Sequence, residues 1–456
     1  MRVLFATPEC EPLTKTGGLG DVSAALPRAL RELDLDVRVL LPGYAEVLRK
    51  LGPCQEVARL DQGRLLQSEK FLVIDCPTLY QRDGGPYQDA AGADWPDNGL
   101  RFGLLSKVAA LLGSARSPLA WRPDVVHCND WPAALAPVFL REERERAATL
   151  LTVHNLAFQG NFAPGLAAEL GLPLLEGLEF YGRMSFLKGG LAYADAINTV
   201  SPTYAREMQT PEYGCGLDGL LRSRRELLSG IANGIDTASW NPAADARIAA
   251  RYDASGLDKK TRNKDALQKR LKLKVGAETP LVGLVGRLTH QKGIDLVIAA
   301  IDELAAMAQV ALLGKGERGY ESALAAAAAR HPGRIAVTIG FNDDLAHAIE
   351  AGADLFLMPS RYEPCGLNQM YSQRYGTLPV ARATGGLVDT ITDGESGFLF
   401  EGTDLSAALR RALAVFKDRR RWRAMQRAAM ARDFSWGEPA RRYAALYRRI
   451  ARLQPA

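Results

Sequence analysis

Short apolar runs alternate with longer stretches of helical periodicity along most of the chain. In the first half, such runs predict strands at residues 3–6, 37–41, 71–74, 125–127, 150–154 and 196–200. In the second half, they predict strands at residues 281–285, 310–313, 335–339, 355–358 and 378–381. Strands that alternate with helices in this way are typical of parallel, doubly wound sheets. The pattern therefore predicts an α/β fold.

The chain, at 456 residues, is longer than one ordinary core requires, and its length favours two or three domains. A boundary is predicted near residues 233–236, where Asn-Gly-Ile-Asp is followed by the polar stretch 240–244. Residues 252–273 predict a basic amphipathic helix that leads into the second group of strands. Near the end of the chain, one face of a predicted helix is apolar and must pack on another element. That face consists of Tyr443, Leu446, Tyr447 and Ile450.

Composition changes this picture little. Hydrophobic residues at 47% and charged residues at 24% are ordinary for a globular protein. The net charge of +5 is mild; it fits a small anionic substrate and does not argue for nucleic acid. The six cysteines contain no C-x-x-C pair, which disfavours a disulfide framework or a zinc site. No apolar stretch approaches the ~18 residues of a membrane span, and no leader pattern opens the chain. We therefore expect a cytoplasmic protein that binds neither nucleic acid nor membrane.

In each half of the chain, a glycine-bearing turn follows the first predicted strand. The first contains Lys15, Thr16, Gly17 and Gly18, and the second spans residues 286–293 with the cations Arg287 and Lys292. Bare N–H groups at a helix N-terminus attract anions, and glycine allows a ligand close to the backbone. Each turn alone could be a tight strand–helix connection with solvated surface cations. Together they indicate one diphosphate held between two domains.

The first turn lacks the spacing of a P-loop and of a complete dinucleotide fingerprint. This disfavours a P-loop ATPase and a nicotinamide oxidoreductase.

Further polar residues follow the predicted strands. His154 ends the strand at 150–154, Asp130 follows the strand at 125–127, and Glu363 follows the strand at 355–358. Pro364 suits a first helical turn, so Glu363 could simply complement a helix dipole. Ligands of doubly wound sheets bind beyond the carboxyl ends of the strands, where these side chains are expected to gather. A third glycine turn at residues 384–386 belongs to the same predicted edge.

Five segments together resemble bacterial glycogen synthases and plant starch synthases. They are residues 15–21, 154–160, 286–293, 363–367 and 384–390. The resemblance runs in order from the first strand to Phe434-Ser435-Trp436, so it covers essentially the whole chain. It implies a glycosyltransferase B-type fold, in which two Rossmann-like domains face each other across a deep cleft. The implied domains are residues 1–235 on the acceptor side, residues 236–436 on the donor side, and a C-terminal helix, 437–456, that crosses back to the first domain.

The resemblance also implies an activity. Such enzymes transfer glucose from ADP-glucose to the non-reducing end of an α-1,4-glucan with retention at the anomeric carbon, in glycogen biosynthesis. No metal and no cofactor are implied, because basic side chains and backbone amides stabilise the diphosphate.

Roles carry over onto matching positions of this chain. The resemblance implies four catalytic residues: the His154 backbone carbonyl beneath the anomeric carbon, Arg287 and Lys292 on the diphosphate, and Glu363 near the donor glucose. Tyr87 matches an aromatic residue that faces the acceptor. The implied substrate-binding set is Lys15, Gly17, Gly18, Asp21, Tyr87, Asp130, Asn155, Asn233, Phe341, Cys365, Gly366, Leu367, Thr384, Gly385 and Gly386.

The chain departs from the family pattern at a few places. Phe341 stands where many relatives have a tyrosine that stacks on adenine, Asn368 replaces a frequent threonine, and the loop 393–396 is short. None of these changes removes an implied catalytic group.

Two other functions remain open on the sequence. Other retaining transferases often carry a second glutamate eight residues after the first, where this chain has Tyr371. A non-catalytic glucan-binding protein on a decayed transferase fold would have lost Lys15, Arg287, Lys292 or Glu363, and all four are present. The choice of ADP-glucose over UDP-glucose rests on the resemblance, and the sequence does not indicate the oligomeric state.

Overall fold

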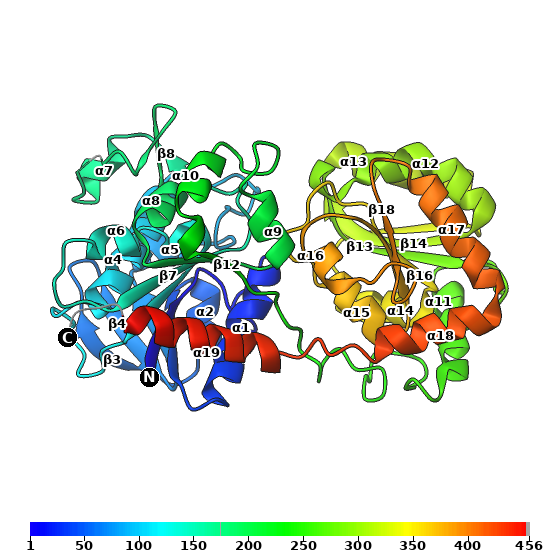
Figure 1. The fold of residues 1–456 in the computed structure, drawn as a ribbon, viewed down its shortest axis with the longest axis horizontal. Coiled ribbons are helices and arrows are strands. Elements are labelled where there is room, and N and C mark those ends of the chain that lie inside the picture. Colours follow the sequence, from blue (N-terminus) through cyan, green and yellow to red (C-terminus); the bar gives the residue numbers. More distant parts are fainter. Residues whose placement is uncertain (174, 453–456) are drawn as a thin grey trace. The chain divides into compact units, whose positions relative to one another are not determined.

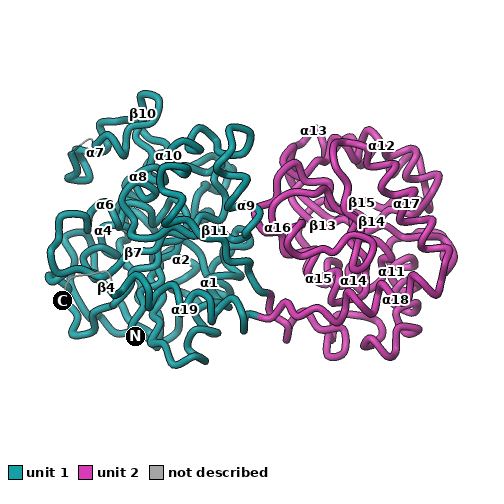
Figure 2. The backbone as a smooth tube through the Cα atoms, viewed as in Figure 1, with its two compact units in different colours: residues 1–234, 436–456 teal, residues 235–435 magenta. Residues whose placement is uncertain are grey.

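The computed structural model describes residues 1–173 and 175–452 and divides the chain into two compact units. Unit 1 comprises Met1–Gly234 and Trp436–Ala456, and unit 2 comprises Ile235–Ser435 (Figures 1 and 2). The chain therefore leaves unit 1 after Gly234 and returns to it at Trp436.

Unit 1 is built on a nine-stranded sheet in the order β12-β11-β7-β6-β1-β2-β5-β4-β3. Its parallel strands are β1 (Arg2–Ala6), β2 (Asp36–Pro42), β5 (Phe71–Asp75), β6 (Val125–Asn129), β7 (Ala148–Val153), β11 (Ala196–Thr199) and β12 (Leu228–Gly230). At one edge, β3 (Gln55–Arg59) and β4 (Arg64–Ser68) pair antiparallel. The apolar run of β1 is completely buried from Val3 to Ala6, as expected for a central parallel strand.

Helices surround this sheet. They are α1 (Gly18–Arg31), α2 (Ala45–Lys50), α3 (Pro77–Tyr80), α4 (Asn98–Leu112), α5 (Asp130–Ala133), α6 (Ala136–Leu140), α7 (Leu166–Glu169), α8 (Phe186–Tyr193), α9 (Pro202–Glu207), α10 (Asp218–Ser223) and α19 (Gly437–Ala451). A small sheet is formed by β8 (Asn161–Phe162), β10 (Arg183–Ser185) and β9 (Glu179–Phe180).

The last helix, α19, packs on unit 1, where it lies beside α1 (red and blue in Figure 1). Its Tyr447 hydroxyl is 2.8 Å from His127 Nδ1, and Asn198 Nδ2 donates to the Tyr443 hydroxyl at 2.8 Å. On the other side of the ring, His127 Nε2 is 2.7 Å from Thr152 Oγ1. Burial lowers the pKa of His127 well below its usual value, so its ring is neutral. The polar contacts therefore connect α19 to the middle of strands β6, β7 and β11.

Unit 2 contains a six-stranded parallel sheet in the order β15-β14-β13-β16-β17-β18. The strands are β13 (Leu281–Leu288), β14 (Gln309–Gly316), β15 (Ile335–Ile339), β16 (Leu355–Met358), β17 (Leu378–Arg382) and β18 (Phe398–Phe400). The helices are α11 (Lys260–Arg270), α12 (Ile294–Met307), α13 (Arg318–Arg330), α14 (Asp343–Gly352), α15 (Asn368–Arg374), α16 (Gly385–Thr390), α17 (Leu405–Lys417) and α18 (Arg419–Met430). All eleven predicted strands are confirmed; two match at both ends, and the ends of the others differ by at most three residues.

Three local predictions are wrong. The helix predicted over residues 252–273 is confined to α11, because Asp253 closes a turn onto the amides of Ser255 and Gly256 before the helix. Pro364 is not in a first helical turn, because Gly366 adopts a φ of 71° and α15 begins only at Asn368. Arg287 lies inside β13 and not in a turn, because that strand continues to Leu288.

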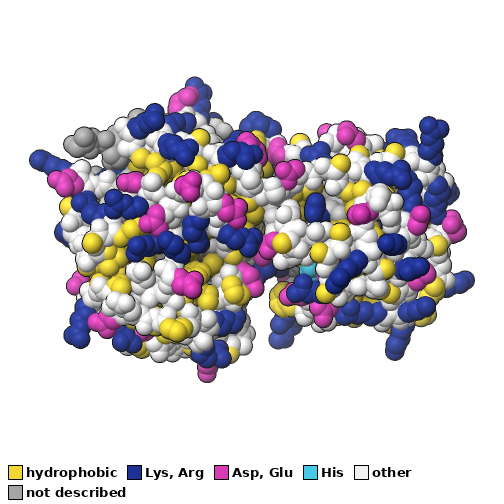
Figure 3. Space-filling view, turned by 90° about the horizontal axis from the view of Figure 1, so that it is seen from below, with side chains coloured by type: hydrophobic (Ala, Val, Ile, Leu, Met, Phe, Trp, Pro, Cys, Tyr) yellow, Lys and Arg dark blue, Asp and Glu magenta, His cyan; other side chains and the backbone are white. Residues whose placement is uncertain are grey.

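No helix in the described part of the chain is both long and apolar enough to cross a membrane. On the face shown in Figure 3, Lys and Arg side chains are interspersed with Asp and Glu side chains.

Candidate active site

The first glycine turn holds a carboxylate from its own chain. Glu9 Oε2 accepts hydrogen bonds from Thr16 N at 2.5 Å and from Gly17 N at 3.0 Å, at the N-terminal end of α1. Glu9 is buried, and burial raises the pKa of its carboxyl, an effect that the two amides partly oppose. Glu9 was not among the sequence-predicted site residues. Its signal in the sequence is its position, three residues after the end of β1.

Lys15, Asp21 and Tyr87 surround this carboxylate. Lys15 Nζ forms an ion pair with Asp21 Oδ1 at 2.7 Å, and both side chains are partly exposed. An exposed pair of this kind is weak, so Lys15 can change partner at small cost when an anion approaches. The Tyr87 hydroxyl donates to Glu9 Oε1 at 3.2 Å, and burial keeps the pKa of this phenol well above its usual value. Tyr87 is thereby fixed as a protonated donor.

Asp130 and His154 meet where β6 and β7 end. Asp130 Oδ1 accepts from the backbone amides of His154 at 2.7 Å and of Asn155 at 3.3 Å. Asp130 itself adopts a φ of 53°, a conformation that is uncommon outside glycine. Burial raises the pKa of Asp130 to about 7, against the effect of the two amides. One carboxylate thus holds the backbone on both sides of His154.

The His154 imidazole is neutral. Burial lowers its pKa to about 3, and its Nε2 atom is 3.0 Å from Asn129 Oδ1. Asn233, the last predicted site residue of unit 1, is buried, and its Oδ1 has no hydrogen-bond partner among the described residues. Buried polar atoms are almost always paired, so this atom is positioned for a ligand group or a water molecule.

In unit 2, Lys292 and Glu363 form a pair. Lys292 Nζ is 2.5 Å from Glu363 Oε2, and the Ser360 hydroxyl donates to the same oxygen at 2.9 Å. Glu363 is buried, whereas the Lys292 side chain remains 25% exposed. The two residues were predicted to act on different parts of the donor, and the structure places them in direct contact. Lys292 therefore reaches the surface of unit 2 with Glu363 behind it.

The segment around Glu363 rests on the start of α16. Gly386 N donates to the carbonyl of Glu363 at 3.0 Å. A Cβ atom on Gly385 would lie 2.0 Å from the Glu363 carbonyl oxygen, and one on Gly386 would lie 2.1 Å from that of Cys365. Glycine is required here because any side chain would push the two backbones apart. This contact brings Glu363 and Cys365 next to the third predicted turn at Thr384.

Arg287 and Phe341 lie outside this cluster. Arg287 is exposed, with a long contact of 3.4 Å from its Nη2 to Gln291 Oε1. The Phe341 side chain is 83% exposed. Arg287 is therefore available to an anion, and Phe341 offers an open aromatic face.

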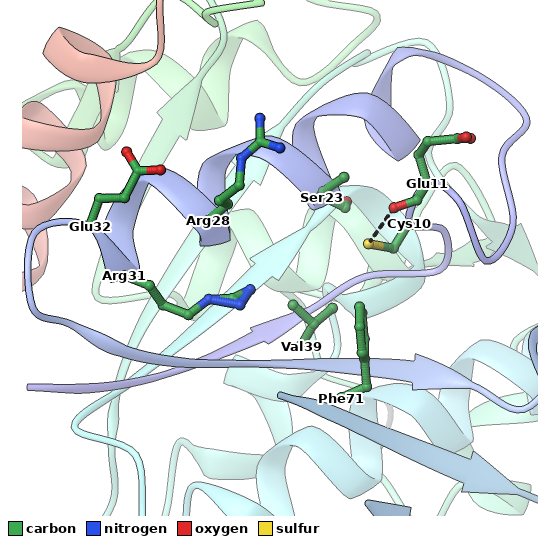
Figure 4. Close-up of a pocket in the computed structure, with 9 residues that line it drawn as sticks. Cys10, Glu11, Ser23, Arg28, Arg31, Glu32, Val39 and Phe71 are labelled. Carbon is green, nitrogen blue, oxygen red and sulfur yellow. Dashed lines mark hydrogen bonds between the residues drawn. The ribbon is translucent and has the colours of Figure 1, made fainter. Parts of the chain in front are cut away.

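A cavity of about 550 Å³ lies elsewhere in unit 1 (Figure 4). Arg28 and Arg31 of α1 line it together with Glu11 and Glu32, and none of its lining residues belongs to the predicted site. Among the residues that the structure describes, no group of three or more His, Cys, Asp or Glu side chains is arranged for a metal ion.

Comparisons with known proteins identify the family. Residues 2–223 match the family model described as starch synthase catalytic domain, and residues 265–432 match that of glycosyl transferases group 1. The glycogen synthase of Aromatoleum aromaticum is 56% identical over 98% of this chain and 96% of its own. The glycogen synthase of Halorhodospira halophila is 51% identical over 99% of both chains.

Solved structures give the same result. The catalytic domain of starch synthase IV from Arabidopsis thaliana, bound to ADP and acarbose, matches with a TM-score of 0.86 and 31% identity over 99% of both chains. A sucrose-phosphate synthase from Thermosynechococcus elongatus shares the fold, with a TM-score of 0.62 and 18% identity. The chain belongs to the glycogen synthase and starch synthase family, and it is a glycosyltransferase with the GT-B fold.

Proposed function

We propose that this enzyme transfers glucose from ADP-glucose to the non-reducing end of an α-1,4-glucan, with retention of anomeric configuration and release of ADP. The observation that carries the proposal is the cluster at the end of β16, where Lys292, Glu363 and the glycine turn of α16 meet. ADP in the Arabidopsis starch synthase structure supports an adenine nucleotide as the leaving group.

In unit 2, Lys292 and Arg287 stabilise the diphosphate as it departs. Fixed cations at the site of developing charge lower the barrier, because the transition state carries more charge there than the substrate does. Lys292 is held by Glu363 at 2.5 Å, so its ammonium is already oriented before a ligand arrives. The Gly386 N–H donates to the Glu363 carbonyl and so fixes the segment that carries Glu363, and Phe341 offers its exposed ring to the base. No metal ion or cofactor has a role in this scheme.

In unit 1, Asp130 sets the direction of the His154 carbonyl. A trans peptide places its C=O and N–H on opposite sides, and the Asn155 N–H donates to Asp130. The His154 carbonyl therefore points away from Asp130, which holds the other side of the same peptide group. We assign to this carbonyl the role of stabilising the positive charge that develops at the anomeric carbon. The acceptor hydroxyl then attacks on the face from which the diphosphate leaves, which accounts for retention without a protein nucleophile.

The proposal is tested by measuring glucose incorporation into glycogen with ADP-glucose and, in parallel, with UDP-glucose. We expect turnover with ADP-glucose. Turnover with UDP-glucose alone would keep the transferase chemistry and overturn the donor. If the folded protein binds ADP but turns over neither donor, then either the assignment of the glucan as acceptor or the assignment of a catalytic function is wrong.

A further inference from the structure

Asn129 is the last residue of β6 and is fully buried, and the sequence did not mark it as a site residue. Its side chain bridges two strands. Asn129 Nδ2 donates to the carbonyl of Ala6 in β1 at 3.1 Å, and Asn129 Oδ1 lies 3.0 Å from His154 Nε2 beyond β7. Every polar atom of this amide is thus used within the sheet.

These contacts determine where the protons lie. A backbone carbonyl only accepts hydrogen bonds, so the NH₂ group of Asn129 must face Ala6 and its oxygen must face His154. The amide oxygen also only accepts, so His154 Nε2 must carry a proton. Because the ring is neutral, Nδ1 is then left with its lone pair.

The Nδ1 atom is available to a ligand. None of the described residues forms a hydrogen bond with it, so its lone pair is left for a ligand group. Within the described part of the chain, Asp130 binds the backbone amides of His154 and Asn155, and the neutral His127 lies two residues before Asn129. Glu9 acts on Asp130 and raises its pKa further.

We propose that Asn129 is a positioning residue that fixes His154 as the neutral Nε2–H tautomer and so presents Nδ1 as a hydrogen-bond acceptor to a sugar hydroxyl. Asn129 and Asp130 hold different parts of His154: Asn129 contacts the ring, and Asp130 contacts the backbone amide. The identity of the ligand rests on the proposed function, whereas the tautomer does not.

The tautomer is measured directly by ¹⁵N NMR of the imidazole side chains, since the chain contains only five histidines. The variant His154→Gln assigns the signal. We expect a single Nε2–H form in the wild type at neutral pH and a mixture of both tautomers in Asn129→Ala. An Nδ1–H form or a cation in the wild type, or an unchanged single tautomer in Asn129→Ala, would overturn the proposal. This measurement needs no substrate, so its result is independent of the proposed function.

Kinetics of Asn129→Asp separate positioning from simple loss of stability. A carboxylate still accepts from Nε2–H and stabilises the imidazolium, so the pKa of His154 rises in this variant, but it has no N–H for the Ala6 carbonyl. Below that pKa, Nδ1 is protonated and cannot accept. We therefore expect Asn129→Asp to lose activity progressively as the pH falls, in addition to a loss at every pH from the missing bond to Ala6, whereas Asn129→Ala loses about tenfold at every pH.

Asn198→Ala is the matched control, because Asn198 is equally buried in the same sheet but contacts Tyr443 instead of His154. Asp130 titrates in all these proteins, and a carboxylate at position 129 also shifts its pKa, so the titration of His154 is followed separately by its ¹⁵N signal. A pH profile of Asn129→Asp that coincides with that of the wild type would contradict the assigned role. So would equal losses in Asn129→Ala and Asn198→Ala.

Discussion

The ammonium of Lys292 is the group on which the proposed chemistry depends most, and Glu363 beside it is buried. In Lys292→Ala, the Ser360 hydroxyl is the one side-chain partner that the carboxylate of Glu363 keeps among the described residues. Removing one partner of a buried pair is costly, and we expect a loss of up to about 3 kcal/mol in stability. We also expect kcat to fall by roughly 10²–10³-fold, because transition-state charge is no longer neutralised.

Arg287→Ala is the control for this experiment. Arg287 is exposed and weakly held, so its loss is expected to lower kcat with little change in the urea unfolding curve. Normal turnover in both variants would refute their role on the diphosphate.

Asp130 gives the protein a distinct dependence of stability on pH. Its pKa is about 7 in the folded protein, against the ordinary value of 3.8, so the folded state binds a proton more tightly between these values. The stability that this provides is complete below pH 3.8 and is lost as the pH rises through 7. Wild type loses this stability as the pH rises, and Asp130→Asn does not. We therefore expect the free energy of unfolding of Asp130→Asn in urea to increase relative to that of wild type from pH 5 to pH 8. A constant difference across this range would show that Asp130 titrates normally.

The sequence located some of these residues and not their partners. His154, Asp130 and Glu363 were found because each follows a buried strand, and parallel strands end at a common edge. Glu9 was missed because its partners are amides seven and eight residues further on, which depend on the path of the loop. The contact of Lys292 with Glu363, 71 residues apart, likewise follows from the fold and not from local pattern.

At the scale of elements, apolar runs identified strands well because a buried parallel strand is apolar on both faces. The pair β3 and β4 was not predicted, because β3 is an exposed edge strand with polar ends, Gln55 and Arg59. The start of α15 was misplaced because a favourable residue, Pro364, precedes a glycine that interrupts the helix. Local propensity therefore failed where a close contact with another element sets the backbone.

That contact, between α16 and the Glu363 segment, makes a prediction for glycine. In Gly386→Ala, the new Cβ would lie 2.1 Å from the Cys365 carbonyl oxygen, so the segment must move. We expect a loss of about 2 kcal/mol or more in stability and a lower kcat, because Glu363 moves with it. Gly319→Ala in α13 is the matched control, since nothing lies within 4 Å of its added Cβ. Thermal unfolding and turnover that are equal in the two variants would contradict this reading.

At the scale of the whole molecule, unit 1 is completed by the end of the chain. Helix α19 covers the sheet with an apolar face, and its two tyrosines pair with the buried polar atoms of His127 and Asn198. His127 lies two residues before Asn129, and its partner Thr152 lies two residues before His154. The helix therefore supports the same two strands that end at the candidate active site.

Ending the chain after Ser435 tests this dependence. We expect unit 1 to melt earlier, because the truncation exposes an apolar surface and removes the tyrosine partners of His127 Nδ1 and Asn198 Nδ2. Unit 2 retains its complete sheet, so ADP binding by calorimetry should persist while glucose transfer is lost. The double variant Tyr443→Phe/Tyr447→Phe keeps the apolar face and should lose only about 1 kcal/mol per hydroxyl. If the truncated chain melted like the wild type, or lost ADP binding along with activity, α19 would not be a structural part of unit 1 alone.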